Sequence, residues 1–374
     1  MRLRSVRLDE LELPLVEPFE TSFGIERRRR LLLLHLEGDS GAVGLGECVA
    51  ARDPLYSSES VATARWFLTR YAIPELLVHE TDHPDRFLER IRGLKGHSMA
   101  KAAAEMALWD LFAKERGEPL AKVLGGRRRR VEVGVSVGIH PTAASLVRRV
   151  GEYLDEGYRR VKLKVRPGWD AEPVEAVRRE HPDLRLWVDA NQAYPPSAGT
   201  EILRWAVRAG VEQVEQPFGE RELEAHARLV RARRFRVCLD ESIVDRPSLE
   251  EAVRRHALSS LNVKPGRVGG LAASQDLARV AAGARIPAWV GGMLETGIGR
   301  AHAVALASLP NFVLPADLSA SRRYYRTEII ETPFELGSGS TLAVPRGPGI
   351  GVAIDEDALR RARRRSRVFR PRGR

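Results

Sequence analysis

Short apolar runs alternate with longer amphipathic stretches from about residue 131 to residue 315. The apolar runs resemble buried strands, and the stretches between them carry apolar residues at helical spacing. Eight units of this kind predict an α/β fold with a closed parallel (β/α)8 barrel. A doubly wound open sheet is the alternative, but no glycine-rich dinucleotide fingerprint follows the first run. The predicted strands are Val131–Gly138, Arg160–Val165, Leu184–Asp189, Val211–Glu215, Phe235–Asp240, Ser260–Lys264, Ala288–Gly291 and Phe312–Pro315.

The beginning of the chain has a different pattern, with strand-like runs first and helical runs afterwards. This order predicts an α+β unit over residues 1–125 that caps a barrel domain over residues 126–330. The predicted strands are Arg4–Leu13, Arg30–Leu36 and Gly44–Glu47. The predicted helices are Glu59–Tyr71, His83–Ile91 and Ser98–Arg116.

The last segment, residues 331–374, is expected to return to the capping domain. Leu342–Val344 and Val352–Ile354 are predicted as short strands, separated by a turn at Arg346–Gly349. The basic residues that follow are expected to form a frayed tail.

Charged residues stand at the ends of five successive predicted strands, about 25 residues apart. In a barrel, the carboxyl ends of all strands lie on one rim, and reactive groups gather there. We therefore expect one cluster that contains Lys162, Lys164, Asp189, Glu215, Asp240 and Lys264.

The three carboxylates of this cluster would repel one another if they converged without a cation. A set of oxygen ligands with room for water and substrate oxygens suits Mg²⁺, with Mn²⁺ as a substitute. Because no histidine or cysteine stands at these three strand ends, zinc is disfavoured. Glu212 has the opposite strand parity to Glu215 and should face the helices. Glu241 is expected behind the ligands, where it would orient them.

Lys162 and Lys164 are two residues apart on one strand, so both point to the same face. Like charge and burial are expected to lower a lysine pKa and to produce a general base. Lys264 lies four strands away, on the far side of an eight-stranded ring. A substrate between Lys164 and Lys264 would meet an amine on each face of its α-carbon.

Composition limits the other possibilities for this chain of 374 residues. Its 43% hydrophobic residues are enough for a large core. Two cysteines, Cys48 and Cys238, are too few for a disulfide scaffold and indicate a reducing, cytoplasmic setting. No signal peptide or membrane segment is visible. The net charge is +11, but the arginine tracts have no interleaved aromatic residues, so we expect no nucleic-acid partner.

Several motifs together resemble one known family. They are V-K-L-K-V (161–165), V-D-A-N (188–191), E-Q-P (215–217), L-D-E-S (239–242) and N-V-K-P-G-R-V-G-G (262–270). This set resembles the muconate-lactonizing subgroup of the enolase superfamily. T-S-F-G (21–24), G-G-M-L-E-T-G-I-G-R-A (291–301) and V-P-R-G-P-G-I-G-V (344–352) narrow the resemblance to the o-succinylbenzoate synthase / N-succinylamino acid racemase family.

The resemblance implies an enolase-like fold and roles for individual residues. Asp189, Glu215 and Asp240 would bind Mg²⁺, and Lys164 would be the base, with Lys264 as its counterpart across the substrate and Lys162 as a third catalytic lysine. The implied substrate-binding residues are Thr21, Phe23, Tyr56, Ser136, Asn191, Arg267, Gly292 and Met293. The chain departs from the family pattern after strand eight, where Ala316 replaces an expected glycine and Arg322 an expected acid.

The implied activity is Mg²⁺-dependent dehydration of 2-succinyl-6-hydroxy-2,4-cyclohexadiene-1-carboxylate to o-succinylbenzoate in menaquinone biosynthesis. Racemisation of N-succinylamino acids is the alternative, and both reactions begin with loss of the same α-proton. A dipeptide epimerase is more distant, because such an enzyme should offer an acidic pair after strand eight and this segment offers only Asp317. We expect a small carboxylate substrate and a homo-oligomer.

Overall fold

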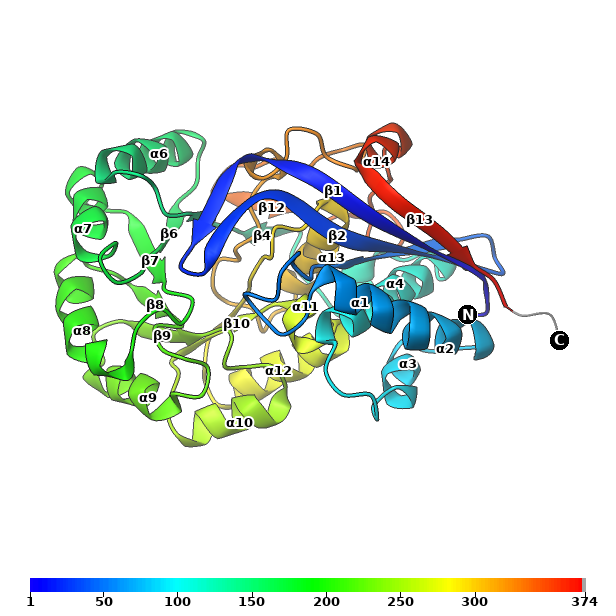
Figure 1. Ribbon diagram of the computed structural model, residues 1–374, viewed down its shortest axis with the longest axis horizontal. Helices are drawn as coiled ribbons and strands as arrows, with labels where there is room; N and C mark the ends of the chain where they lie inside the picture. Colours follow the sequence, from blue (N-terminus) through cyan, green and yellow to red (C-terminus); the bar gives the residue numbers. More distant parts are fainter. Residues whose placement is uncertain (372–374) are drawn as a thin grey trace.

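A ring of parallel strands forms one half of the structure, which is a computed structural model that describes residues 1–371 (Figure 1). Each strand pairs with the next one along the chain, so that the sheet order is β5 to β11 without a break. These strands are β5 (Val135–Val137), β6 (Arg160–Lys164), β7 (Arg185–Asp189), β8 (Gln213–Glu215), β9 (Arg236–Leu239), β10 (Ser260–Val263) and β11 (Ala288–Val290). The predicted parallel α/β architecture is confirmed.

Residues 312–317 fill the eighth position of the ring. The Val313 N–H donates to the Ala288 carbonyl at 3.0 Å on one side, and the Ala316 N–H donates to the Glu132 carbonyl at 2.9 Å on the other. These contacts are isolated bridges and not a regular strand. The predicted strand Phe312–Pro315 is therefore in the expected place, although its pairing is shorter than a strand requires.

Helices surround the ring, and most of them present an apolar face to the strands and a charged face to solvent, whereas α13 (Gly297–Ala307) is buried along its whole length. In α8, for example, Ile202, Trp205 and Ala206 are buried. The outer helices are α6 (Ala143–Asp155), α7 (Ala171–Glu180), α8 (Gly199–Arg208), α9 (Leu223–Ala232), α10 (Arg246–Arg254), α12 (Leu271–Gly283) and α13 (Gly297–Ala307). A short additional helix, α11 (Pro265–Val268), lies between β10 and α12.

The N-terminal part is a four-stranded antiparallel sheet with the order β13-β1-β2-β3, packed on helices. Its strands are β1 (Leu3–Thr21), β2 (Gly24–Gly38), β3 (Val43–Cys48) and β13 (Arg363–Phe369). Its helices are α1 (Val61–Phe67), a π-helical turn (Leu68–Ala72), α2 (Ile73–Val78), α3 (Asp85–Arg90), α4 (Ser98–Glu115) and α5 (Leu120–Val123). A Cβ at Gly44 or Gly46 would collide with the backbone of α4, so glycine allows this close packing.

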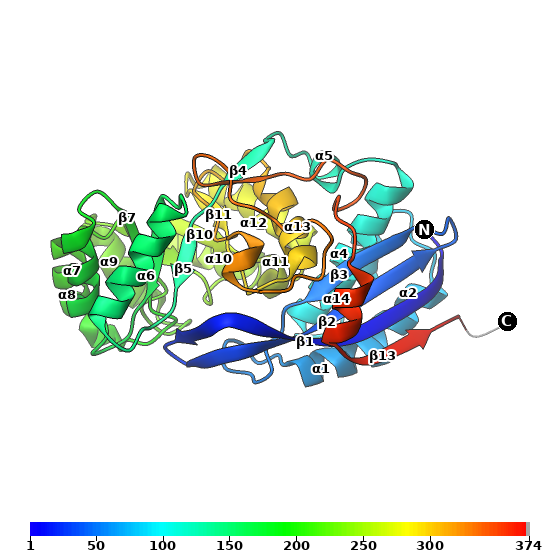
Figure 2. The ribbon, with the colours of Figure 1, turned by 90° about the horizontal axis from the view of Figure 1, so that it is seen from above.

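The hairpin of β1 and β2 reaches far beyond this sheet, across the ends of the barrel strands (Figures 1 and 2). At its tip, the Ser22 hydroxyl donates to the Asn191 carbonyl at 3.2 Å. The N-terminal part therefore covers the rim where the sequence places the charged cluster.

The end of the chain differs from two expectations. Leu342–Val344 was expected to return to the capping domain, but β12 (Thr341–Ala343) pairs with β4 (Arg130–Glu132) beside the barrel. Val352–Ile354 forms only one bridge, between Ile330 and Ile354.

The basic tail is also not frayed over the described residues. Helix α14 (Glu356–Ala362) leads into β13, which pairs with β1. Arg363 and Arg364 lie 3.3 and 3.1 Å from the carboxylates of Asp9 and Glu12. The free edge of β1 and its two acidic residues thus hold the arginines in place. Residues 372–374 lie outside the described part.

In the described residues, no helix combines the length and the apolar composition needed to cross a membrane.

Candidate active site

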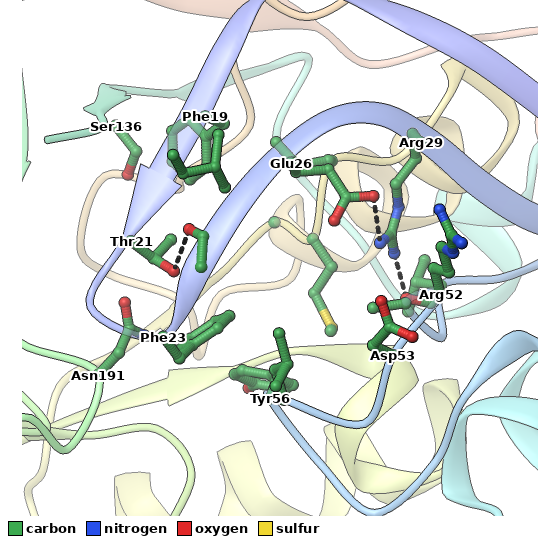
Figure 3. A pocket seen from close by; sticks show the side chains of 18 of the residues that line it. Phe19, Thr21, Phe23, Glu26, Arg29, Arg52, Asp53, Tyr56, Ser136 and Asn191 are labelled. Atoms are coloured by element: carbon green, nitrogen blue, oxygen red, sulfur yellow. Dashed lines mark hydrogen bonds and ion pairs between the residues drawn. The ribbon is translucent and has the colours of Figure 1, made fainter. Parts of the chain in front are cut away.

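A cavity of about 410 Å³ lies between the barrel rim and the N-terminal hairpin (Figure 3). Side chains from both parts of the chain line it. The barrel contributes Ser136, Lys162, Lys164, Asn191, Lys264, Gly292 and Met293 among others, and the N-terminal part contributes Thr21, Phe23 and Tyr56. All of these residues belong to the predicted site, so the fold brings them together at one cavity.

The three predicted metal ligands lie at consecutive strand ends beneath this cavity. Asp189 and Glu215 are the last residues of β7 and β8 and are direct register partners. Asp240 follows β9 immediately. All three side chains are fully buried. Burial of a carboxylate is costly unless the group is paired, so each of them should have a cationic partner.

Lys162 stands at the centre of the carboxylates. Its Nζ lies 2.7 Å from Glu215 Oε2, 3.0 Å from Asp317 Oδ2 and 3.4 Å from Asp189 Oδ2. It also lies 4.9 Å from the centre of the Trp289 ring, which closes the space below it. Lys162 is therefore held by three ion pairs at the floor of the cavity.

Lys164 forms one wall of the cavity. Its Nζ donates to Asp189 Oδ2 at 2.6 Å and to Asn191 Oδ1 at 2.7 Å. The Asn191 amide donates in turn to Glu241 Oε1 at 3.0 Å, so that Glu241 fixes the orientation of Asn191. Glu241 thus lies behind the ligands, as expected. Its burial, together with the charge of Asp189, raises the pKa of Glu241 to about 7.

Lys264 forms the opposite wall, since three strands separate β6 from β10 in the ring. Its Nζ donates to Asp240 Oδ2 at 2.6 Å and to the Tyr56 hydroxyl at 3.3 Å. The Tyr56 hydroxyl donates to Asp240 Oδ1 at 3.0 Å. Tyr56 comes from the N-terminal part, so this wall combines residues of both parts of the chain.

Arg267 is also near Asp240, but it does not line the cavity. Its guanidinium forms an ion pair with Asp240 and donates to the Ile243 carbonyl at 2.8 Å and the Asn262 carbonyl at 2.5 Å. The structure therefore places Arg267 behind a predicted metal ligand, not among the residues that face a substrate.

The expectation of a lowered lysine pKa is wrong for Lys162. Burial does lower the pKa of Lys162, but the charges of Asp317, Glu215 and Asp189 outweigh burial and raise it. Burial also lowers the pKa of Lys264, but Tyr56 and the charges of Glu215, Glu241 and Asp189 outweigh burial and raise it. The prediction considered only the repulsion between ammonium groups. The same rim supplies as many carboxylates, and their charges favour the protonated lysine.

The donor set fits a hard divalent cation. Asp189, Glu215 and Asp240 supply only oxygen atoms, are fully buried and come from adjacent strands. Within residues 1–371, however, no three acidic, histidine or cysteine side chains are grouped so that they could hold a metal ion as they stand. Each of the three carboxylates is instead hydrogen-bonded to a lysine. Metal binding would require these lysines to give up part of their contact with the carboxylates.

The glycine-rich loop after β11 supplies part of the cavity wall. A Cβ at Gly292 would lie 2.6 Å from the Asp317 carbonyl, so only glycine fits there. The helix that follows, α13, does not offer its N-terminus to a ligand, because Glu47 of β3 accepts from the N–H groups of Thr296 and Gly299 at 3.1 and 3.0 Å. Within the loop, the Met293 N–H donates to Glu295 Oε2 at 2.9 Å, so this N–H is not free for a substrate carboxylate either.

Two further residues of the site, Asp317 and Asn262, were not predicted from the sequence. Asp317 binds Lys162 and accepts from Ser136 Oγ at 2.6 Å and Arg160 Nη1 at 2.9 Å. Asn262 donates to Glu215 Oε1 at 2.6 Å. The strand-end rule could have found Asp317 after strand eight, and strand parity with Lys264 could have found Asn262.

Comparison with known proteins identifies the family. Residues 4–125 match the family model "Mandelate racemase / muconate lactonizing enzyme, N-terminal domain", and residues 145–358 match "Enolase C-terminal domain-like". An N-succinylamino acid racemase from Amycolatopsis sp. is 48% identical over 94% of this chain and 95% of its own length. An o-succinylbenzoate synthase from Geobacillus stearothermophilus is 39% identical over 99% of this chain and 98% of its own length.

The fold comparison agrees with the sequence comparison. The crystal structure of an enolase-superfamily member from Listeria innocua superposes with a TM-score of 0.94 at 36% identity, and the match covers all of both chains. The chain therefore belongs to the enolase superfamily, in the mandelate racemase and muconate lactonizing enzyme family that contains proteins named o-succinylbenzoate synthase and N-succinylamino acid racemase.

Proposed function

We propose that this enzyme is an o-succinylbenzoate synthase, which dehydrates 2-succinyl-6-hydroxy-2,4-cyclohexadiene-1-carboxylate in cytoplasmic menaquinone biosynthesis. One observation carries the proposal: Lys164 and Lys264 face one cavity from opposite walls, above three buried carboxylates. Relatives that bear this name, at 39% identity, support the choice of substrate. The two unpaired, buried cysteines support a reducing compartment.

Members of this family generally use Mg²⁺, and Asp189, Glu215 and Asp240 are the residues that would hold it. When bound, Mg²⁺ (or Mn²⁺) would supply positive charge to the oxygens of a substrate carboxylate, on which negative charge builds when the α-proton leaves.

In the proposed reaction, the neutral amine of Lys164 removes the α-proton, and the C–H electron pair moves into the carboxylate to give an enediolate. Lys162 and Lys164 contact the same oxygen, Asp189 Oδ2, at 3.4 and 2.6 Å. The ammonium of Lys264 stabilises the enediolate from the other face.

The second half of the reaction restores the carboxylate. The electron pair returns and expels the hydroxyl group from the neighbouring ring carbon. The Lys164 ammonium donates its proton to that hydroxyl, which leaves as water, so the base ends in its starting form. Proton removal and hydroxyl protonation by one lysine make the elimination syn.

N-succinylamino acid racemase activity is the second candidate, and the position of Lys264 favours it. If Lys264 protonates the enediolate on the face opposite Lys164, the α-carbon is inverted. Relatives with this name, at 48% identity, support this reading as well as the first. Both proposals require a small carboxylate substrate, and the expected homo-oligomer stays a prediction.

Purified enzyme should be assayed with the cyclohexadiene precursor and with N-succinylamino acids, each with Mg²⁺ and with EDTA. We expect both substrates to react with Mg²⁺ and neither to react with EDTA until Mg²⁺ is restored. Absence of dehydration would exclude the synthase, and absence of racemisation would exclude the second candidate. Activity that persists in EDTA would contradict the metal site.

A further inference from the structure

A fully buried carboxylate of the N-terminal part, Glu105 of α4, binds the start of a barrel helix. Glu105 Oε2 accepts from the Leu271 N–H and Oε1 accepts from the Ala272 N–H, both at 2.9 Å. These are the first residues of α12. Oε1 also accepts from Trp109 Nε1 at 2.8 Å. All three partners are uncharged donors, and no cationic side chain is among the neighbours that shift the pKa of Glu105 in residues 1–371.

A helix N-terminus favours a carboxylate, because its free N–H groups and the helix dipole carry positive charge. Burial without a counter-ion still costs free energy and raises the pKa of Glu105 to about 7. The chain therefore retains a costly buried acid at this contact. A neutral side chain that only filled the space would leave the N–H groups of Leu271 and Ala272 without an acceptor.

The segment between Lys264 and this contact is tightly packed against the N-terminal part. Lys264 is the residue that precedes α11, and α11 leads through Gly269 and Gly270 into α12. A Cβ at Gly266 would lie 2.3 Å from Val49 Cγ2, and a Cβ at Gly270 would lie 2.5 Å from Glu105 Oε2. Residues 264–270 are thus packed directly against the N-terminal part at two points.

Arg267 ties the same segment to the metal-ligand side of the site. It lies within α11, contacts Asp240 and donates to the Ile243 carbonyl at 2.8 Å. A shift of α11 would therefore move both Lys264 at its start and Arg267 within it. Lys164, on β6, has no packed segment of this kind: its hydrogen-bond acceptors Asp189 and Asn191 belong to the barrel, and the N-terminal hairpin contacts Asn191 through the Ser22 hydroxyl, which donates to the Asn191 carbonyl at 3.2 Å.

We propose that Glu105 is a positioning residue that sets the location of Lys264 and Arg267, so that the N-terminal part controls the reaction at one face of the substrate. The inference rests on the proposed α-proton chemistry. It implies that loss of the Glu105 carboxylate affects the two faces of the α-carbon unequally. A purely structural role would slow both faces together.

The test compares Glu105→Gln with Asp110→Asn, which lies on the same helix. Glutamine keeps the size of the side chain but turns an NH₂ group toward backbone donors. Asp110 is also fully buried and accepts from two backbone N–H groups, but these belong to Leu45 and Ile350, away from the cavity. The variant Lys264→Ala assigns the two faces, because it shows which enantiomer presents its α-proton to Lys264.

Each variant is incubated in ²H₂O with N-succinyl-L-phenylalanine or N-succinyl-D-phenylalanine, and the initial loss of the α-proton signal is followed by NMR. A displacement of about 1 Å in a reacting group costs up to about a hundredfold. We expect Glu105→Gln to slow exchange on the Lys264 face about tenfold more than on the Lys164 face. Asp110→Asn should leave the ratio of the two rates as in the wild type. An unchanged ratio in Glu105→Gln would overturn the inference.

A second measurement does not depend on activity. Amide hydrogen exchange of residues 264–272, followed by mass spectrometry, should be faster in Glu105→Gln than in the wild type and unchanged in Asp110→Asn. Equal protection of this segment in all three proteins would overturn the inference. If the wild type exchanges the α-proton of neither enantiomer, the proposed racemase activity fails, and the amide measurement still decides the role of Glu105.

Discussion

Lys164 and Lys264 occupy equivalent places at strand ends, but their surroundings differ. The acceptors of Lys164 are Asp189 and Asn191, both from the barrel. Lys264 contacts Asp240 of the barrel and Tyr56 of the N-terminal part, and its loop is packed against Val49 and Glu105. The difference teaches that the side chains of one wall come from the barrel, which the N-terminal hairpin touches there through the hydrogen bond from Ser22 to the Asn191 carbonyl. The other wall depends on how the N-terminal part docks.

Both proposed reactions should require the amine of Lys164. Lys164→Ala removes the only proposed base on that face, so we expect dehydration and racemisation to fall by about 10²- to 10⁴-fold or more. Steady-state rates with both substrates measure the effect. Lys122→Ala is a suitable control, because Lys122 is exposed and pairs only with Glu118 in the described residues. Near-normal dehydration in Lys164→Ala would assign the base elsewhere.

Loss of the Lys264 amine should stop racemisation but should not stop proton exchange on the Lys164 face. Lys264→Ala should lower racemisation by about 10²- to 10⁴-fold, because no group remains to protonate the second face. Exchange of the α-proton that faces Lys164 should continue, without inversion. Polarimetry and NMR in ²H₂O measure the two effects in one sample. Full racemase activity in this variant would rule out a two-base mechanism.

Tyr56→Phe should show how much the N-terminal part contributes to the reaction rate on the Lys264 face. This change removes a hydroxyl that donates to Asp240 and accepts from Lys264. A hydrogen bond to a charged group is worth about 1.5–3 kcal/mol, so we expect a loss of about tenfold on the Lys264 face. Tyr71→Phe is the matched control, since the hydroxyl of Tyr71 lies outside the cavity lining. Equal effects of the two changes would contradict the prediction.

The stability of the contact between the two parts should also depend on pH. Burial raises the pKa of Glu47 and of Glu105 to about 7, from an ordinary value of 4.5. Between these values the folded protein keeps a proton that the unfolded chain has released. The free energy of unfolding should therefore fall as pH rises through this window, by at most about 3 kcal/mol for each group.

Glu105→Gln removes one of these two groups, so the stability gap between the variant and the wild type should narrow from pH 5 to pH 8. Denaturant unfolding at several pH values measures the gap. A gap that is the same at every pH would show that Glu105 does not titrate in this range.

The strand-end pattern was the most informative feature of the sequence. It predicted Lys162, Lys164, Asp189, Glu215, Asp240 and Lys264 as one cluster, and the structure gathers all six. Spacing sufficed because every barrel strand ends on the same rim. Strand spacing could not predict the protonation of Lys162. The pKa of Lys162 depends on how far the charges of three carboxylates outweigh burial, and this depends on distances in the folded protein.

Prediction was weakest where a segment gains its structure only from a distant partner. The arginine-rich residues of β13 have no apolar alternation, yet they pair with β1 because Asp9, Glu12 and a free strand edge are there to receive them. Leu342 likewise joins β4 and not the N-terminal sheet. Local pattern carries no information about such partners.

The sequence by itself determined the barrel, the order of its strands and the charged groups at their ends, because periodicity and strand spacing are local properties. Only the tertiary structure decided that Tyr56 reaches Lys264, that Arg267 lies behind Asp240 and that Glu105 holds the start of α12. These contacts join residues up to about 200 positions apart. They arise from the docking of two separately patterned parts of the chain, and this docking makes the two walls of one cavity different.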